Sequence, residues 1–277
     1  MKKILLIGCG KMGFALLQRW VKYIDPQNIY VVQPSQHSRD KVAELGVHVF
    51  SKVDELPELT NIIVVFAVKP QVLLDILPSY KYLITKAIFL TVVAGVTEVV
   101  YQQKLGENLA LVRVMPNTPS AIGEGVLGYW ANDLVAEEDI KIVETLLSYN
   151  GYSFLVKNEL DLDKVTALSG SGSAYVFYFL EVMIKMAQEY GFNEETAYKI
   201  AQNTVKGAVL LSEKSDFSIE ELRQQVTSPN GTTQKALEIL MHQTHGLFPL
   251  LKNTILAAEK RSKELGAAVS NNLNNKL

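Results

Sequence analysis

Residues 4–13 read ILLIGCGKMG, a short apolar run followed by glycines at positions 8, 10 and 13. This G-x-G-x-x-G spacing, with Leu16, Leu17 and Trp20 at helical spacing beyond it, predicts a strand, a tight turn and a helix. Glycines here let the turn close, let the backbone approach a pyrophosphate, and let the helix pack on the strand. The helix N-terminus adds amide donors and positive potential. We therefore predict a dinucleotide site that includes Gly8, Cys9, Gly10, Lys11, Met12 and Gly13.

Further apolar runs, rich in Val and Ile, alternate with helical patterns up to about residue 157. Such runs, with little polar alternation, are typical of strands that are buried on both faces. Alternation of β and α segments predicts a doubly wound, mostly parallel sheet. We predict an α/β Rossmann domain over residues 1–158, with strands at residues 4–7, 29–32, 47–50, 62–68, 87–93, 109–114 and 152–156.

The remainder of the chain, residues 159–277, is predicted to be an all-α domain. Its apolar residues recur at helical spacing, as in Tyr175 and Phe179, and turn signals at residues 191–193, 215–218 and 228–231 separate roughly four helices. The tail 270–277 lacks this periodicity and is expected to be frayed. Helices that are apolar over most of their circumference need a second covering layer, so we expect this domain to self-associate.

Composition excludes several classes of protein. With 277 residues, 48% hydrophobic and 20% charged, and a net charge of −2, the chain fits two domains and lacks the basic surface of a nucleic-acid-binding protein. The single Cys9 excludes an intramolecular disulfide and suits a reducing compartment, and no metal constellation is visible. The basic, apolar start is too short for a signal peptide, and no apolar stretch is long enough for a membrane span. We expect a cytoplasmic protein that binds neither nucleic acid nor membrane.

Residues after the other strands complete the predicted cofactor cleft. NAD sites usually place an Asp or Glu at the end of the second strand, but here residues 33–39 read QPSQHSR, with no acid. Hydroxyl, amide and Arg39 donors tolerate a 2′-phosphate, so NADPH is preferred, with NADH as the alternative. Lys69 and Asn117 are expected to contact ribose or brace loops rather than catalyse. The residues assigned to the cofactor here are Gln33, Ser35, Gln36, Ala67, Val68, Lys69, Pro70, Ala94, Gly95 and Asn117.

Reduction of a ketone is a poor fit to this sequence. The alkoxide that forms needs a proton donor such as His, Lys or Tyr. The four histidines lie near the adenosine end of the cofactor, at a strand end, and far into the predicted last helix: His37, His48, His242 and His245. Dehydrogenases of the β-hydroxyacid class carry a Lys shortly after a glycine pair such as that in residues 168–175, LSGSGSAY. Here the next lysine is Lys185, which argues against that class.

An imine carboxylate is a better fit. Its nitrogen can be protonated by solvent near neutral pH, so the enzyme need only bind and align the C=N bond. Residues 226–237, VTSPNGTTQKAL, combine hydroxyls with a helix start, although locally they also fit a simple capped connector. The amides of Gly231, Thr232 and Thr233 would bind the carboxylate, and a Thr hydroxyl would hydrogen-bond the nitrogen.

Five motifs in this order resemble the pyrroline-5-carboxylate reductase family over nearly the whole chain. They are residues 8–13 (GCGKMG), 67–70 (AVKP), 115–119 (MPNTP), 168–175 (LSGSGSAY) and 226–233 (VTSPNGTT). The resemblance implies NAD(P)H-dependent reduction of 1-pyrroline-5-carboxylate to L-proline, the final step of proline biosynthesis. It also implies a helical domain that interleaves with its twin in a homodimer, often assembled further into a decamer.

The resemblance also implies roles for individual residues. Thr233 would be the catalytic hydroxyl on the ring nitrogen, and Glu159 would lie near the nicotinamide ribose. The substrate would be bound by Val226, Thr227, Ser228, Gly231, Thr232 and Thr233. This chain departs from the family pattern at Asn230, which can take the positive φ of the glycine it replaces, and at Ser173, which replaces a proline.

Two other functions remain open at this point. One is reduction of a different cyclic imine carboxylate, such as the six-membered ring homologue. The other is a catalytically silent nucleotide-binding assembly protein, which would show a degraded substrate loop, whereas the hydroxyls here are intact.

Overall fold

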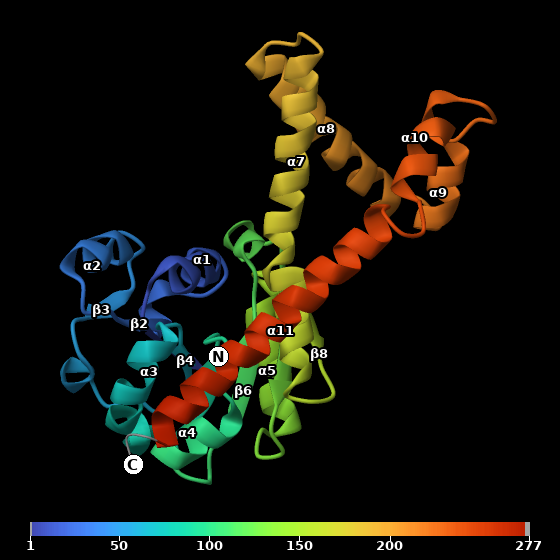
Figure 1. Cartoon of the computed structure of the whole chain (residues 1–277). Coiled ribbons are helices and arrows are strands. Elements are labelled where there is room, and N and C mark those ends of the chain that lie inside the picture. Colours follow the sequence, from blue (N-terminus) through green and yellow to red (C-terminus); the bar gives the residue numbers. More distant parts are fainter. Residues whose placement is uncertain (1, 275–277) are drawn as a thin grey trace. The chain divides into compact units, whose positions relative to one another are not determined.

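The computed structural model describes residues 2–274 (Figure 1). All of the strands in these residues belong to one sheet in the first half of the chain. The sheet has eight strands in the order β3-β2-β1-β4-β5-β6-β7-β8. Neighbouring strands are parallel from β3 through β6 and antiparallel between β6 and β7, and β8 is again parallel to β7. The bounds are β1 Lys3–Ile7, β2 Ile29–Val32, β3 His48–Phe50, β4 Ile62–Phe66, β5 Ala87–Thr91, β6 Leu111–Met115, β7 Gly125–Ala131 and β8 Gly151–Leu155.

Both faces of this sheet are covered, as predicted for a doubly wound fold. Alternate residues of β1 point to opposite faces, so Ile4 and Leu6 belong to one apolar core while Leu5 and Ile7 belong to the other. The first core is closed by α1 (Lys11–Trp20), α2 (Gln36–Ala43) and α5 (Glu137–Ser148). The second is closed by α3 (Pro70–Ile76) and α4 (Glu98–Leu105). The predicted Rossmann architecture is confirmed.

Strand β7 was not among the seven strands predicted from the sequence. Its sequence GVLGYWA contains two glycines and no Val- or Ile-rich run, so it lacks the usual strand signal. The structure explains Gly128, since a Cβ at that position would lie 2.8 Å from the methyl carbons of Val165. Glycine is therefore retained for close packing against α6 (Asp161–Val165) rather than for a turn.

The helical half continues with a π-helical turn at Thr166–Gly170 and five helices. The chain divides into two compact units: residues up to Ser171 together with α11 from Ala258 onward, and Gly172–Ala257. Helix α11 thus contributes to both units. The helices are α7 Gly172–Glu189, α8 Glu194–Glu213, α9 Ile219–Gln225, α10 Thr232–Leu240 and α11 Leu247–Asn274.

The predicted helix breaks are present, but the end of the chain differs from expectation. A further break separates α10 from α11 at residues 241–246, where a Cβ on Gly246 would lie 2.4 Å from the carbonyl oxygen of His242. His242 and His245 therefore lie in a turn, not far into the last helix. Helix α11 extends to Asn274, so residues 270–274 are helical rather than frayed, and 275–277 lie outside the described residues.

The second unit has almost no apolar core of its own. Its buried hydrophobic residues are three alanines, while many of its large apolar side chains are exposed. Phe177 is 59% exposed, Tyr178 65% and Phe248 77%. Alanines bury too little area to stabilise a domain of this size, so these helices require a further covering surface.

One helical run, Asp161–Glu189, is long and apolar enough by length and composition to cross a membrane. No membrane span was predicted from the sequence, because Ser, Gly and Thr residues interrupt the apolar runs of this helix. A helix apolar on most sides also suits a protein interface, and one helix of this kind is weak support for a membrane span.

Candidate active site

The glycine turn is built as the sequence predicted. Gly8 has a φ of 84°, and a Cβ there would lie 2.5 Å from Val68 Cγ1, while a Cβ on Gly13 would lie 2.5 Å from the Gly8 carbonyl oxygen. These two glycines are needed for the turn itself and for packing of helix on strand. A Cβ on Gly10 would meet nothing within 4 Å, so Gly10 faces open space at the N-terminus of α1.

That open space is a cavity of about 460 Å³ at the carboxyl ends of β1, β2, β3 and β4. In the sheet register Ile7 lies beside Val32 and Phe66, which brings the segments that follow these strands together. The lining is mostly apolar, with two lysines and no acid among the described residues. It comprises Ile7, Gly8, Gly10, Val32, Gln33, Pro34, Ser35, Ser51, Lys52, Val53, Ala67, Val68, Lys69, Val72, Ile76, Ser79 and Tyr80.

The cavity fits a dinucleotide on three grounds. It lies at the carboxyl edge of a parallel sheet, it opens onto the N-terminus of α1, and Gly10 leaves room for close approach of phosphate to the backbone. Lysines without accompanying carboxylates suit a polyanion. The cavity brings together the predicted cofactor residues Gly8, Gly10, Gln33, Ser35, Ala67, Val68 and Lys69.

Other predicted cofactor residues do not line this cavity. Cys9 belongs to the apolar core and Met12 packs against it, because alternate residues of the turn face opposite ways. Burial raises the pKa of the Cys9 thiol to about 12, so Cys9 is an inert packing residue. Lys11, Gln36, Pro70, Ala94, Gly95, Asn117 and Glu159 also lie outside the lining.

The Arg39 guanidinium, expected to be a donor for the cofactor, is already occupied. It donates hydrogen bonds to the carbonyl oxygens of Gln33, at 3.0 Å, and Pro34, and to the side-chain oxygen of Gln36. Arg39 therefore holds the loop after β2 in place. Lys52, which was not among the predicted cofactor residues, lines the cavity from the segment after β3.

Asn117 braces a loop, one of the two roles expected for it. Its side-chain oxygen accepts a hydrogen bond from the Val126 amide at 2.8 Å, and its side-chain nitrogen donates to the Ser169 carbonyl at 3.2 Å. Through these two bonds the Asn117 side chain, which is only 7% exposed, links β7 to the turn before α7. Gly95, with a φ of 75°, packs against the backbone of Gly266 in α11.

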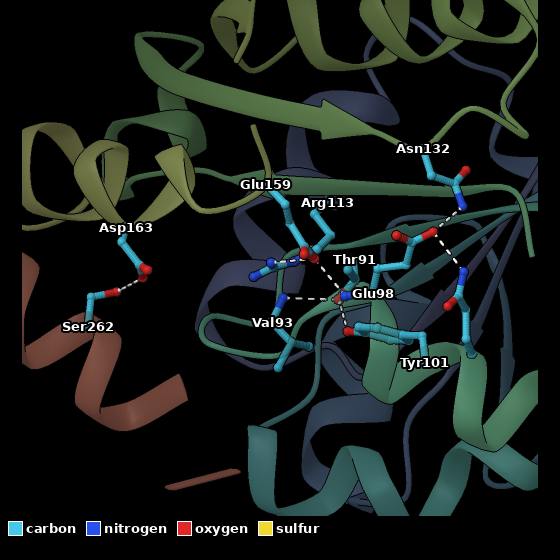
Figure 2. Close-up of polar contacts among 10 residues, drawn as sticks. Thr91, Val93, Glu98, Tyr101, Arg113, Asn132, Glu159, Asp163 and Ser262 are labelled. Carbon is cyan, nitrogen blue, oxygen red and sulfur yellow. Dashed lines mark hydrogen bonds and ion pairs between the residues drawn. The ribbon is translucent and has the colours of Figure 1, made fainter. Parts of the chain in front are cut away.

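Glu159 takes part in a buried polar network at the ends of β5 and β6 (Figure 2). Its carboxylate pairs with Arg113 Nη1 at 2.7 Å and accepts the backbone N–H of Glu98 at 2.6 Å. The Glu98 carboxylate in turn accepts a hydrogen bond from Asn132 at 2.6 Å. A carboxylate at the N-terminus of α4 also complements the helix dipole. No role was predicted for Arg113, because a single Arg inside an apolar strand belongs to no recognisable sequence motif.

A cavity of about 230 Å³ adjoins this network, lined by Gly95, Arg113, Glu159 and residues of α11. The Ser262 hydroxyl of α11 donates a hydrogen bond to the Asp163 carboxylate at 2.5 Å. This contact is drawn in Figure 2. This hydrogen bond and the packing of Gly266 against Gly95 hold the middle of α11 beside the segment that follows β5.

The hydroxyl-rich segment, residues 226–233, lies in the second unit as a turn between α9 and α10. Asn230 has a φ of 59°, which confirms that it can take the place of a glycine. The Gly231 amide donates to the Ser228 carbonyl at 3.0 Å, so the amides left to bind a carboxylate are those of Thr232 and Thr233.

The hydroxyls of this loop differ in their partners. Thr227 donates to the Arg223 carbonyl at 2.6 Å. Within residues 2–274, the hydroxyls of Ser228, Thr232 and Thr233 have no hydrogen-bond partner, and they lie beside the first turn of α10. Ser228 and Thr232 are exposed and Thr233 is half-buried. Free amides at a helix start are suited to bind an anion. The chain's described residues contain no group of three metal-ligating side chains.

Family models match both halves of the chain. Residues 159–265 match the family model described as pyrroline-5-carboxylate reductase dimerisation, and residues 3–95 match that described as NADP oxidoreductase, coenzyme F420-dependent. The pyrroline-5-carboxylate reductase of Methanosarcina acetivorans is 34% identical over 271 residues, covering 96% of this chain and 98% of that protein.

Two solved structures share the fold over nearly the whole chain. That of a pyrroline-5-carboxylate reductase from Coxiella burnetii has a TM-score of 0.88 and 31% identity, covering 95% of this chain and 98% of that one. That of pyrroline carboxylate reductase from Plasmodium falciparum, with NADP bound, has a TM-score of 0.83 and 28% identity, covering 96% and 98%.

Proposed function

Because the chain belongs to the pyrroline-5-carboxylate reductase family, we propose that its substrate is held by the turn between α9 and α10 and that Thr233 is the catalytic hydroxyl. The enzyme reduces 1-pyrroline-5-carboxylate to proline with NAD(P)H. The strongest support is the 34% identity to the Methanosarcina acetivorans enzyme over 96% of this chain, together with the intact hydroxyls in the substrate loop.

The loop supplies what binding of a protonated cyclic imine requires. The Thr233 hydroxyl would accept a hydrogen bond from the ring nitrogen and fix the orientation of the C=N bond. The amides of Thr232 and Thr233, with the Ser228 hydroxyl, would bind the carboxylate, and Val226, Thr227 and Gly231 would complete the wall. NAD(P)H, when bound, supplies the hydride that adds to the imine carbon. No ionisable side chain is needed in the loop, because the nitrogen takes its proton from water.

On the cofactor side, the cavity residues Gly8, Gly10, Gln33, Ser35, Ala67, Val68 and Lys69 would hold the dinucleotide. Lys11, Gln36, Ala94, Gly95 and Glu159 would contact it beyond the cavity, at either end. Because Glu159 is held by Arg113 and by the amide of Glu98, it would present a fixed carboxylate to the nicotinamide ribose.

We further propose that residues 159–277 form the substrate-binding and dimerisation domain and that the enzyme is a homodimer, with a decamer as the larger assembly the family resemblance implies. The exposed apolar helices and the match to a dimerisation model support this assembly. We place the enzyme in the cytoplasm, since its single free cysteine suits a reducing compartment. A different cyclic imine substrate and a silent assembly protein are not favoured.

Thr233→Val tests the role of the hydroxyl, since it keeps the shape of the side chain. We expect kcat/KM for 1-pyrroline-5-carboxylate to fall roughly 10- to 1000-fold, the effect of losing about one to four kcal/mol of polar contact. The matched control Thr233→Ser keeps the hydroxyl and should stay within about tenfold of wild type. Cofactor affinity should hardly change in either variant. Unchanged turnover in Thr233→Val would remove this hydroxyl from the mechanism.

A further inference from the structure

We propose that Lys52 binds the 2′-phosphate of NADPH and determines the preference of this enzyme for NADPH over NADH. The inference rests on the proposed use of the cavity by a dinucleotide. It concerns the edge of the cavity that is built by the segments after β2 and β3, where the adenosine ribose of a dinucleotide lies in folds of this kind.

Sheet register places Lys52 at this edge. Val32 of β2 lies beside Phe50 of β3, and the Gln33 amide donates to the Phe50 carbonyl at 2.9 Å. The segments that follow the two strands therefore leave the sheet together. Gln33 and Ser35 from one, and Ser51 and Lys52 from the other, line the same cavity.

The residues around Lys52 are arranged for an anion. An acid at the end of β2 would bind a ribose diol and repel a 2′-phosphate, but residues 33–35 are Gln, Pro and Ser. Among the described residues no Asp or Glu lines the cavity, and Lys52 makes no ion pair. The nearby Glu55 carboxylate attracts Lys52 electrostatically, but its hydrogen bonds go to Ser51. Lys69, the other lysine in the lining, lies after β4, across the cavity from the segment after β3 in the sheet order.

Arg39, the cation suggested by sequence, is a poor candidate. Its guanidinium bonds to the Gln33 and Pro34 carbonyls and to the Gln36 side chain, and these bonds would have to break before it could reach a phosphate. Its position instead fixes the loop after β2, which lies beside the segment of Lys52. Arg39 therefore fixes the conformation of the loop after β2, and Lys52 supplies the positive charge for the 2′-phosphate.

The segment that carries Lys52 is itself held in place. Glu55 accepts hydrogen bonds from the Ser51 amide at 2.8 Å and the Ser51 hydroxyl at 2.7 Å. These bonds from Ser51, with a smaller contribution from Lys52, lower the pKa of the Glu55 carboxyl. Lys52 follows directly, in extended backbone at φ −149° and ψ 163°, with its side chain exposed.

Direct binding measurements test the proposal without any turnover. NADPH and NADH are titrated by fluorescence against wild type, Lys52→Met and Lys52→Arg, and adenosine 2′,5′-bisphosphate and 5′-AMP by calorimetry. For Lys52→Met we expect the Kd of NADPH and of the bisphosphate to rise about 10- to 100-fold, while those of NADH and 5′-AMP stay within about twofold. Lys52→Arg should retain the preference, and added salt should narrow the difference between wild type and Lys52→Met.

Control variants separate the possible outcomes. Lys41→Met, in α2 outside the cavity lining, should change no Kd, and Lys69→Met should weaken both cofactors alike. Equal losses for NADPH and NADH in Lys52→Met, or no loss, would overturn the assignment. Since no imine is present, a selective loss supports it even if the protein fails to reduce 1-pyrroline-5-carboxylate. Failure of wild type to bind either cofactor would instead reject the dinucleotide site itself.

Discussion

Replacing Gly10 by Ala should weaken cofactor binding without disturbing the fold. Gly10 has a φ of −73° and a ψ of −163°, which alanine adopts freely, and its Cβ would meet no atom within 4 Å. We therefore expect the free energy of unfolding to change by no more than about 0.5 kcal/mol. The new methyl group would project into the space where phosphate must approach the backbone, so the Kd of NADPH should rise roughly tenfold or more, about 1.4 kcal/mol.

Gly13→Ala is the contrasting variant for this prediction. Its Cβ would lie 2.5 Å from the Gly8 carbonyl oxygen and 3.2 Å from the Ala67 Cβ, so strand and helix must separate. Overpacking of this kind costs about 1–3 kcal/mol of stability. Urea unfolding followed by the fluorescence of the two tryptophans, Trp20 and Trp130, measures the stability, and NADPH titration measures the affinity. Wild-type affinity in Gly10→Ala would refute placement of the pyrophosphate against this glycine.

Three further predictions concern the rest of the molecule. Arg113→Met leaves the Glu159 carboxylate in a largely buried place without its cation and should lower stability by about 3–5 kcal/mol in urea unfolding; a loss below about 1 kcal/mol would show the pair is dispensable. Cys9, with its pKa raised to about 12 by burial, should resist a thiol reagent at pH 8 in the folded protein and react fully in denaturant, and rapid native labelling would contradict its burial. Phe177→Asp on exposed α7 should shift the solution mass towards the monomer, and an unchanged mass would exclude this face from the interface.

Features with a strong local signal were predictable from the sequence. The glycine turn and the Val- and Ile-rich strands combine composition with spacing, so the Rossmann sheet and the helical second half followed from them. Asn230 was recognised because few residues other than glycine adopt positive φ readily.

Features that depend on tertiary contacts were not predictable in the same way. β7 was not predicted, because Gly128 weakens its strand signal. The reason for this glycine is its close packing against Val165, which lies far along the chain. The use of Arg39 as a loop brace and the position of Lys52 at the cavity follow from the pairing of β2 with β3. The break between α10 and α11 was not predicted, because Gly246 is its only local signal and apolar residues at helical spacing lie on both sides of it.

The most direct test of function is the oxidation of NADPH by the purified protein in the presence of 1-pyrroline-5-carboxylate, followed by absorbance. An enzyme-free blank and a keto acid serve as controls, and the six-membered imine carboxylate is assayed in parallel. Rapid turnover with the five-membered imine, little with its homologue and none with the keto acid is the predicted result. A folded protein that binds NADPH yet reduces none of these substrates, or that prefers the six-membered ring, would contradict it.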